Sequence, residues 1–213
     1  VGDQALASNT TASNNTAIGY QAAYSNTTGA RNTAHGYQAG YSNSTSDYNT
    51  ATGYQTLFTN TGAYNTAVGA LAMYANTTGT ENIAVGVSAL DSNTTGSYNT
   101  VIGTSALQAN TTASNNTAVG YQAGYSNQTG ANITAIGIQS GYSFIGSVSE
   151  SYGSTFLGRQ AGQSTTSGYD NAFVGARAGN NNTTGATNVA VGAAALYSNT
   201  TGYESVAVGY QAL

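Results

Sequence analysis

The sequence of 213 residues contains no cysteine and no proline, and it carries very few charges. Without cysteine there can be neither a disulfide framework nor a thiolate metal site. Charged residues amount to 5%, and the net charge is −4 with only three basic residues. Because phosphate binding needs clustered cations, nucleic acid is not an expected partner. No apolar run approaches the ~20 residues of a membrane-spanning helix, so we expect no membrane insertion.

Groups for catalysis are equally scarce. His35 is the only histidine and there is no lysine, so no nucleophile–base pair is apparent. The seven carboxylates share no common position in the pattern described below, and Glu150 with Asp170 is the least unfavourable pair for glycoside hydrolysis. A lone histidine also offers no metal site. We therefore predict no enzyme activity, no metal and no cofactor.

What the chain does contain is a phrase, such as NTAVGYQAGYSNQTGAN at 116–132, that returns along its whole length. The glycine that ends each NTAVG-like segment is used here as a marker. Successive markers are 17 residues apart in ten of twelve intervals, 16 once and 21 once. Such spacing is typical of a solenoid, in which each repeat buries its apolar side against the next. The markers are Gly2, Gly19, Gly36, Gly53, Gly69, Gly86, Gly103, Gly120, Gly137, Gly158, Gly175, Gly192 and Gly209.

The marker segment also predicts the type of solenoid. Seventeen residues are too few for two packed helices. NTAVG is rich in β-branched residues and ends in glycine, as expected of a short strand before a turn. We predict an all-β fold, a parallel β-solenoid of about twelve 17-residue coils, with ~4.8 Å between coils and a length of roughly 60 Å. Residues 1–213 form one domain, expected to be a segment of a longer array. The four-residue insertion predicts an irregular coil at about 138–157.

The columns of the repeat predict which side chains are buried. The residue before the marker is almost always Val, Ile or Leu, and we expect it to form the core column. The Thr-rich position two residues earlier is expected on the same face. His35 occupies a core position and is expected to be neutral and hydrogen-bonded to Thr52, one coil along. Small residues three after the marker predict close approach of backbone, inside the coil or against another chain.

The turn half of the phrase, YSNTTGAY, is rich in Asn, Thr and Gly, which bond to the local backbone and tolerate positive φ. Stacked asparagines are expected to form amide ladders along the rod. Tyrosines recur one and five residues after the marker, and we expect their rings to stack on the solenoid wall, where they stabilise the rod or grip sugars.

Many of these asparagines lie in N-x-S/T sequons, which predict exposed loops of a secreted protein. Turn chemistry alone also selects NTTG, so the sequons have a second explanation. If they are occupied, glycans form a row along one edge, one per coil. The thirteen candidates are Asn9, Asn14, Asn26, Asn43, Asn76, Asn93, Asn110, Asn115, Asn127, Asn132, Asn181, Asn182 and Asn199.

The region 143–158, SFIGSVSESYGSTFLG, interrupts the pattern. It carries the insertion, and no sequon starts between Asn132 and Asn181. Loops tolerate insertions and carry function, so a specific contact is predicted here, although a tolerated loop over a repacked core explains it as well. The contact candidates are Phe144, Ile145, Arg159 and Arg177.

The segments NTAIG, NIAVG, NVAVG and SVAVG, each followed three residues later by Ala, resemble the head repeats of trimeric autotransporter adhesins, written roughly S-V-A-I-G-x-x-A. Similar phrases occur in repetitive phage tail-fibre and bacterial surface-fibre proteins. The resemblance covers nearly the whole chain, but the repeat here is longer by the SNTTG loop. The resemblance implies a left-handed parallel β-roll, usually trimeric, that adheres to host matrix. The column of Ala between the Thr-rich and the Val/Ile positions would then line the contact between chains.

From these observations we expect a structural segment of an extracellular or cell-surface fibre or adhesin that extends and displays a surface, with a glycan coat and without catalysis. The expected partners are further copies of the chain, stacked end to end or as a homotrimer, and surface glycans or host matrix. One alternative is a carbohydrate-binding solenoid that uses the Tyr ladders. Another is an ice-binding solenoid, which needs a flat Thr face, whereas the Thr pairs of SNTTG lie in turns.

Overall fold

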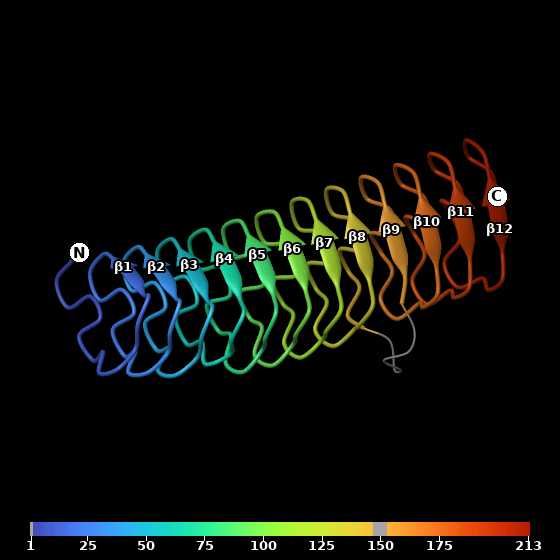
Figure 1. Ribbon diagram of the computed structural model, residues 1–213. Coiled ribbons are helices and arrows are strands. Elements are labelled where there is room, and N and C mark those ends of the chain that lie inside the picture. The colour runs from blue at the N-terminus through green and yellow to red at the C-terminus, as the bar shows by residue number, and fades with distance from the viewer. Residues whose placement is uncertain (1, 147–152) are drawn as a thin grey trace.

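The chain folds into a rod of stacked coils, with the two chain ends at opposite ends of the rod (Figure 1). The computed structural model describes residues 2–146 and 153–213. Each coil contributes one three-residue strand, and the twelve strands form one parallel sheet in sequence order along one side. The predicted all-β solenoid is therefore confirmed. The strands are β1 (Thr16–Ile18), β2 (Thr33–His35), β3 (Thr50–Thr52), β4 (Thr66–Val68), β5 (Ile83–Val85), β6 (Thr100–Ile102), β7 (Thr117–Val119), β8 (Thr134–Ile136), β9 (Thr155–Leu157), β10 (Ala172–Val174), β11 (Val189–Val191) and β12 (Val206–Val208).

Equivalent residues of successive repeats lie directly beside each other. In β1 and β2, for example, Ala17 pairs with Ala34. The register survives both irregular intervals, because β3 pairs with β4 across the 16-residue coil and β8 with β9 across the insertion. Residues 147–152, which include Glu150 of the carboxylate pair, lie outside the described residues. Length changes are thus absorbed in the turns, and the sheet keeps its columns.

Each coil bends at residues in the left-handed region of φ. In the coil that follows β6, φ is 137° at Gly103, 56° at Ser105, 44° at Leu107 and 61° at Asn115. An L-residue in this region costs about 1–2 kcal/mol. Backbone hydrogen bonds to neighbouring coils offset this cost, as where the Ser105 N–H donates to the carbonyl oxygen of Val87 at 2.9 Å. The coil shape is therefore stable only within the stack.

The strands bury the opposite face from the one predicted: the first and last residues, expected in the core, point outward. The middle residue of every strand is buried, and the two outer residues are exposed or half-buried. In β6, Val101 is fully buried, whereas Ile102, expected in the core, is 43% exposed. The predicted Val/Ile core column is wrong because side chains alternate along a strand and the coil is too narrow for large side chains at every interior position.

The interior is filled from two sides. The small residues three after the marker, such as Ala89 and Ala106, are fully buried. They therefore lie inside their own coil and not against another chain. The alanines in the middle of the strands, such as Ala84 and Ala118, are also fully buried, so the Ala column does not line a contact between chains, contrary to what the resemblance implied. The next residue along is often larger, and Leu90 and Leu107 at this position are fully buried. Two small columns and one larger column make up most of the apolar core.

Phenylalanines are accommodated by glycines at matching positions. Phe156 and Phe173 replace alanine in the middle of β9 and β10, and both are fully buried. Six residues after each, where several other coils carry leucine, stand Gly162 and Gly179. A Cβ on either glycine would overlap the ring of the phenylalanine six residues before it. The core thus exchanges one large side chain for another across the coil.

This exchange predicts a compensating pair of substitutions. Gly179→Leu alone should destabilise the fold, because the new side chain overlaps Phe173. Combining it with Phe173→Ala recreates the arrangement of Ala190 and Leu196 one coil along, so the double variant should lose no more than about 1.5 kcal/mol, as volume-conserving core changes do. Urea unfolding followed by circular dichroism measures both. Additive losses in the double variant would show that the two positions do not share one space.

Candidate functional site

The surface most distinctive of this rod is the outward face of its sheet, defined here as the first and last residues of β1–β12. These residues form two parallel columns, and none of them is buried. Neighbouring side chains lie ~4.8 Å apart along a column, and the columns lie roughly 6.6 Å apart. The first column is mostly threonine and the second mostly Val, Ile or Leu. Backbone hydrogen bonding between coils holds both columns in a fixed array.

The outward face is large and almost free of charge. Exposed apolar side chains such as Val68, Val85 and Ile102 follow one another without a gap. Eleven spacings of ~4.8 Å by three strand residues of ~3.3 Å give roughly 520 Å². From Val68 to Val208 the second column is a continuous apolar strip beside the threonine column. Contiguous exposed apolar surface often marks an interaction site.

The face changes from polar to apolar along the rod. In β2 and β3 the last residues are His35 and Thr52, whereas both outer residues of β11 and β12 are valine. His35 is paired in register with Thr52, as predicted. Its side chain is exposed on the outward face, however, so its expected core position is wrong for the same reason as that of the Val/Ile column.

Two asparagine ladders run through the interior, as expected from the repeat. In one of them, Asn93 Nδ2 donates to Asn76 Oδ1 at 2.7 Å and to the Gly96 carbonyl oxygen at 2.9 Å. Asn110 Nδ2 then donates to Asn93 Oδ1 at 2.8 Å. In the other, the Asn99 backbone N–H donates to Asn82 Oδ1 at 3.0 Å. These ladders satisfy most of the buried amides, with Asn26 Oδ1, Asn43 Oδ1 and Asn116 Nδ2 as exceptions. No charged side chain is buried among the described residues.

The ladders change the interpretation of the sequons. A glycan is attached at Nδ2, and a fully buried Nδ2 that donates to neighbouring coils has no room for one. The predicted row of one glycan per coil is therefore incompatible with the folded rod. Seven of the thirteen candidates are buried at the ladder position of the repeat, although Asn43 bonds only to the Ser46 carbonyl oxygen of its own coil: Asn26, Asn43, Asn76, Asn93, Asn110, Asn127 and Asn182. The others are exposed or half-buried: Asn9, Asn14, Asn115, Asn132, Asn181 and Asn199.

The turn threonines have a structural role as well. The residue after the ladder asparagine donates its hydroxyl to the next coil, as when Thr77 Oγ1 bonds to the Thr94 carbonyl oxygen at 2.8 Å. Thr94 repeats this contact to Thr111 at 2.9 Å. In the 16-residue coil, Asn60 Nδ2 still donates to the Gly62 carbonyl oxygen at 2.7 Å, although one turn residue is missing. The NTTG phrase is thus explained by contacts between coils.

The predicted tyrosine ladders are present at both positions of the repeat. Tyr20, Tyr37 and Tyr54 stack with centroid distances of 5.3 and 5.2 Å. Tyr24 and Tyr41 stack at 5.2 Å with an interplanar angle of 4°. Sugars bind to the open face of an aromatic ring, and both faces of Tyr37 are covered by its neighbours. This geometry argues against the alternative of a sugar-binding platform built from the Tyr20 stack.

The four contact candidates near the insertion do not form one surface. Phe144 is buried and lies edge-on to Phe156 at a centroid distance of 6.0 Å, so its expected contact role is wrong. Ile145 is exposed in a turn. Arg159 and Arg177 are both exposed on adjacent coils, where the Arg177 N–H donates to the Arg159 carbonyl oxygen at 2.9 Å. Only the two arginines are brought together.

Ionisable groups form no reactive arrangement in the part of the chain that the structure describes. No group of three or more His, Asp or Glu side chains there could hold a metal ion. Burial raises the pKa of the Asp91 carboxyl above its usual range, and a hydrogen bond with Gln108 opposes this shift. A raised pKa can mark a catalytic acid, but a single shifted carboxyl is not a catalytic arrangement. The described residues also contain no helix long and apolar enough to cross a membrane.

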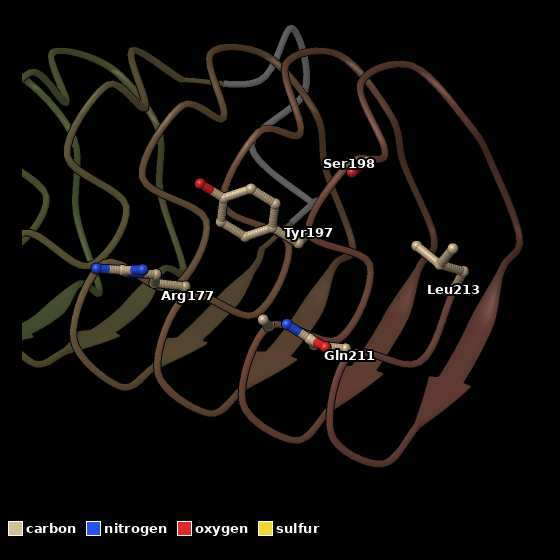
Figure 2. A pocket seen from close by; sticks show the side chains of 6 residues that line it. Arg177, Tyr197, Ser198, Gln211 and Leu213 are labelled. Atoms are coloured by element: carbon tan, nitrogen blue, oxygen red, sulfur yellow. The ribbon is translucent and has the colours of Figure 1, made fainter.

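A pocket of about 380 Å³ lies on the wall of the last coils. Figure 2 shows its side chains spread over successive coils, with Arg177 extending away from Leu213. Apart from Arg177 and Tyr197, the lining side chains carry no ionisable group. The pocket thus lacks the converging polar groups of a small-molecule site. A comparison with known protein families, curated proteins and solved structures finds no match to this chain.

Proposed function

We propose that this chain is a structural segment of an extracellular or cell-surface fibre or adhesin, and that it associates with further copies of itself through the outward face. The single observation that carries this proposal is the continuous, nearly uncharged face along the whole sheet. Its area of roughly 520 Å² on each copy gives an interface of about 1,000 Å² in total, at the small end of the range for specific association. The resemblance to trimeric adhesin heads and tail-fibre repeats supports the same assignment.

A second copy fits this face better than an unrelated partner. Two identical rods have the same spacing between coils, so their columns can interdigitate along the full length. The columns contain no Asp, Glu, Lys or Arg, so like-charge repulsion between copies is confined to flanking groups such as Glu81, which lies beside Thr66 and Ile83. Closed rings of identical chains, such as trimers, bury the face on every copy and leave none open for further growth. The proposed arrangement is therefore side by side, with parallel rods around a common axis.

The test is a charge placed on the face. Ile102→Glu combined with Val119→Glu should weaken self-association at least 100-fold, because each unpaired buried charge costs several kcal/mol. Sedimentation and light scattering would show the loss of oligomer mass, with an unchanged circular dichroism spectrum. The matched control is Thr95→Glu, which adds a charge to an exposed turn away from the face. A parent chain that is monomeric at all concentrations, or an unaffected double variant, would contradict the proposal.

One observation favours a second candidate, an ice-binding surface. The strand threonines, unlike the Thr pairs of SNTTG that lie in the turns, form an outward column. Four successive threonines, Thr16, Thr33, Thr50 and Thr66, begin the column, but Ile83 interrupts it and Ala172 ends it. Thermal hysteresis produced by the monomeric chain, and lost on Thr33→Tyr, would favour this candidate over self-association.

A further inference from the structure

We propose that the exposed stack of Tyr20, Tyr37 and Tyr54 is a site of oxidative cross-linking, where dityrosine bonds join neighbouring coils of one chain. The three phenol rings are nearly parallel, with interplanar angles of 19° and 9°. Their centroids lie 5.3 and 5.2 Å apart. All three side chains are between 41% and 52% exposed, so a small oxidant reaches their edges. This inference concerns a single chain and does not rest on self-association.

The composition directs oxidation to these rings. Cysteine and methionine are the residues usually oxidised first, yet the chain has no cysteine and no tryptophan. Its one methionine, Met73, is fully buried. Exposed phenols are therefore the most accessible groups for a one-electron oxidant. Neighbouring rings in the stack are held close by the hydrogen bonds between coils, which gives them a high effective concentration for each other.

The required oxidant is hydrogen peroxide acting through a haem peroxidase. Each of two tyrosines loses one electron and one proton from its phenol, leaving two phenoxyl radicals. The radicals combine through the ring carbons beside the oxygen, which forms one C–C bond. The hydrogen on each of these carbons then moves to the oxygen and restores the aromatic rings. Hydrogen peroxide takes up the two electrons and two protons and becomes two molecules of water.

Other stacks are less suitable for this reaction. Tyr125 stacks on Tyr142 at 5.1 Å, but both side chains are half-buried and form a single pair. Tyr41 is followed by Phe58, which has no phenol and ends that series after one pair. Tyr48 stacks on Tyr64, but the Arg31 guanidinium lies over the Tyr48 ring at 5.0 Å. A cation held against the ring disfavours the loss of an electron from it. The Tyr20 stack has neither obstacle, and its central ring has a phenol on both sides.

The experiment treats the folded chain with peroxidase and hydrogen peroxide. Dityrosine fluorescence should appear at monomer mass on a denaturing gel, and mass spectrometry of peptides should locate links between Tyr20 and Tyr37 and between Tyr37 and Tyr54. The yield of these links should be at least tenfold higher in the folded chain than in urea, since unfolding removes the effective concentration. Tyr37→Phe keeps a ring in the stack and should abolish both links.

The matched control is Tyr121→Phe. Tyr121 occupies the same position of the repeat and is 49% exposed, but its neighbours one coil away are Thr104 and Ile138. Removing this phenol should leave the Tyr20–Tyr37 and Tyr37–Tyr54 yields unchanged. The proposal is overturned if no dityrosine forms, if the links join different chains only, or if the yield is the same in urea. Equal loss of the mapped links in both variants would overturn it as well.

Discussion

Gly103→Ala is expected to destabilise the rod by about 4 kcal/mol or more, a loss that few single substitutions reach. Two effects combine at this marker glycine. Its φ of 137° belongs to a region that only glycine adopts readily, and another residue there costs ~1–3 kcal/mol. An added Cβ would also overlap the Gly120 carbonyl oxygen of the next coil, which is backbone and cannot move aside. Urea unfolding measured by circular dichroism gives the loss.

Gly209→Ala separates the two effects. Gly209 is also a marker, with a similar φ of 126°, but the nearest atom to its added Cβ is the Ala212 Cβ at 4.0 Å. This variant should therefore show only the conformational cost of ~1–3 kcal/mol. If both variants lost the same stability, overlap between coils would not be the reason that the marker is glycine.

The second large effect is expected for Asn93→Ala. This substitution leaves Asn76 Oδ1 without a partner. It also removes one of the two hydrogen bonds made by the Gly96 carbonyl oxygen and one of the two made by Asn110 Nδ2. One buried polar group without a hydrogen bond costs about 1–3 kcal/mol and each further lost bond about 1 kcal/mol, so the free energy of unfolding should fall by ~3–5 kcal/mol. Thermal and urea unfolding both report the change.

Thr95→Ala is the matched control for the ladder. It removes the same sequon, but Thr95 is exposed in the turn and the ladder stays intact. The ladder interpretation predicts a change within about 0.5 kcal/mol, as for most surface substitutions. A glycan-dependent rod would respond alike to both variants, because either one destroys the sequon. Equal effects in protein from a glycosylating host would thus refute the structural role assigned to Asn93.

The fold was predictable because its evidence is periodic. Spacing alone gives the number of coils, and β-branched residues before each glycine locate the strands. Which face is buried was harder, since TAV alternates equally well in either sense. One signal was present: the middle position is mostly alanine, and its two phenylalanines, Phe156 and Phe173, never share a coil with a leucine six residues later. Large side chains at two positions exclude each other when both point into the same coil, so this pattern indicates the interior.

The outward face and the buried sequons could not be derived in the same way. An asparagine in a turn is usually exposed, and the prediction followed that rule for Asn93. It is buried here because each amide finds its partner in another coil, and such contacts become visible only once repeats are superposed in space. Ile102 is predicted in the core because large apolar side chains are usually buried. A narrow coil has little interior, so a large apolar side chain is left at the surface.

The 16-residue coil has a consequence for how such a protein changes over generations. There the ladder asparagine bonds to Gly62 across a shortened turn, and the strands on both sides keep their pairing. Gain or loss of one complete 17-residue repeat by unequal recombination of the gene would disturb the contacts between coils even less, since the coils that become neighbours present equivalent residues to each other. Length is thus a heritable variable, adjustable in steps of ~4.8 Å without redesign of any single contact.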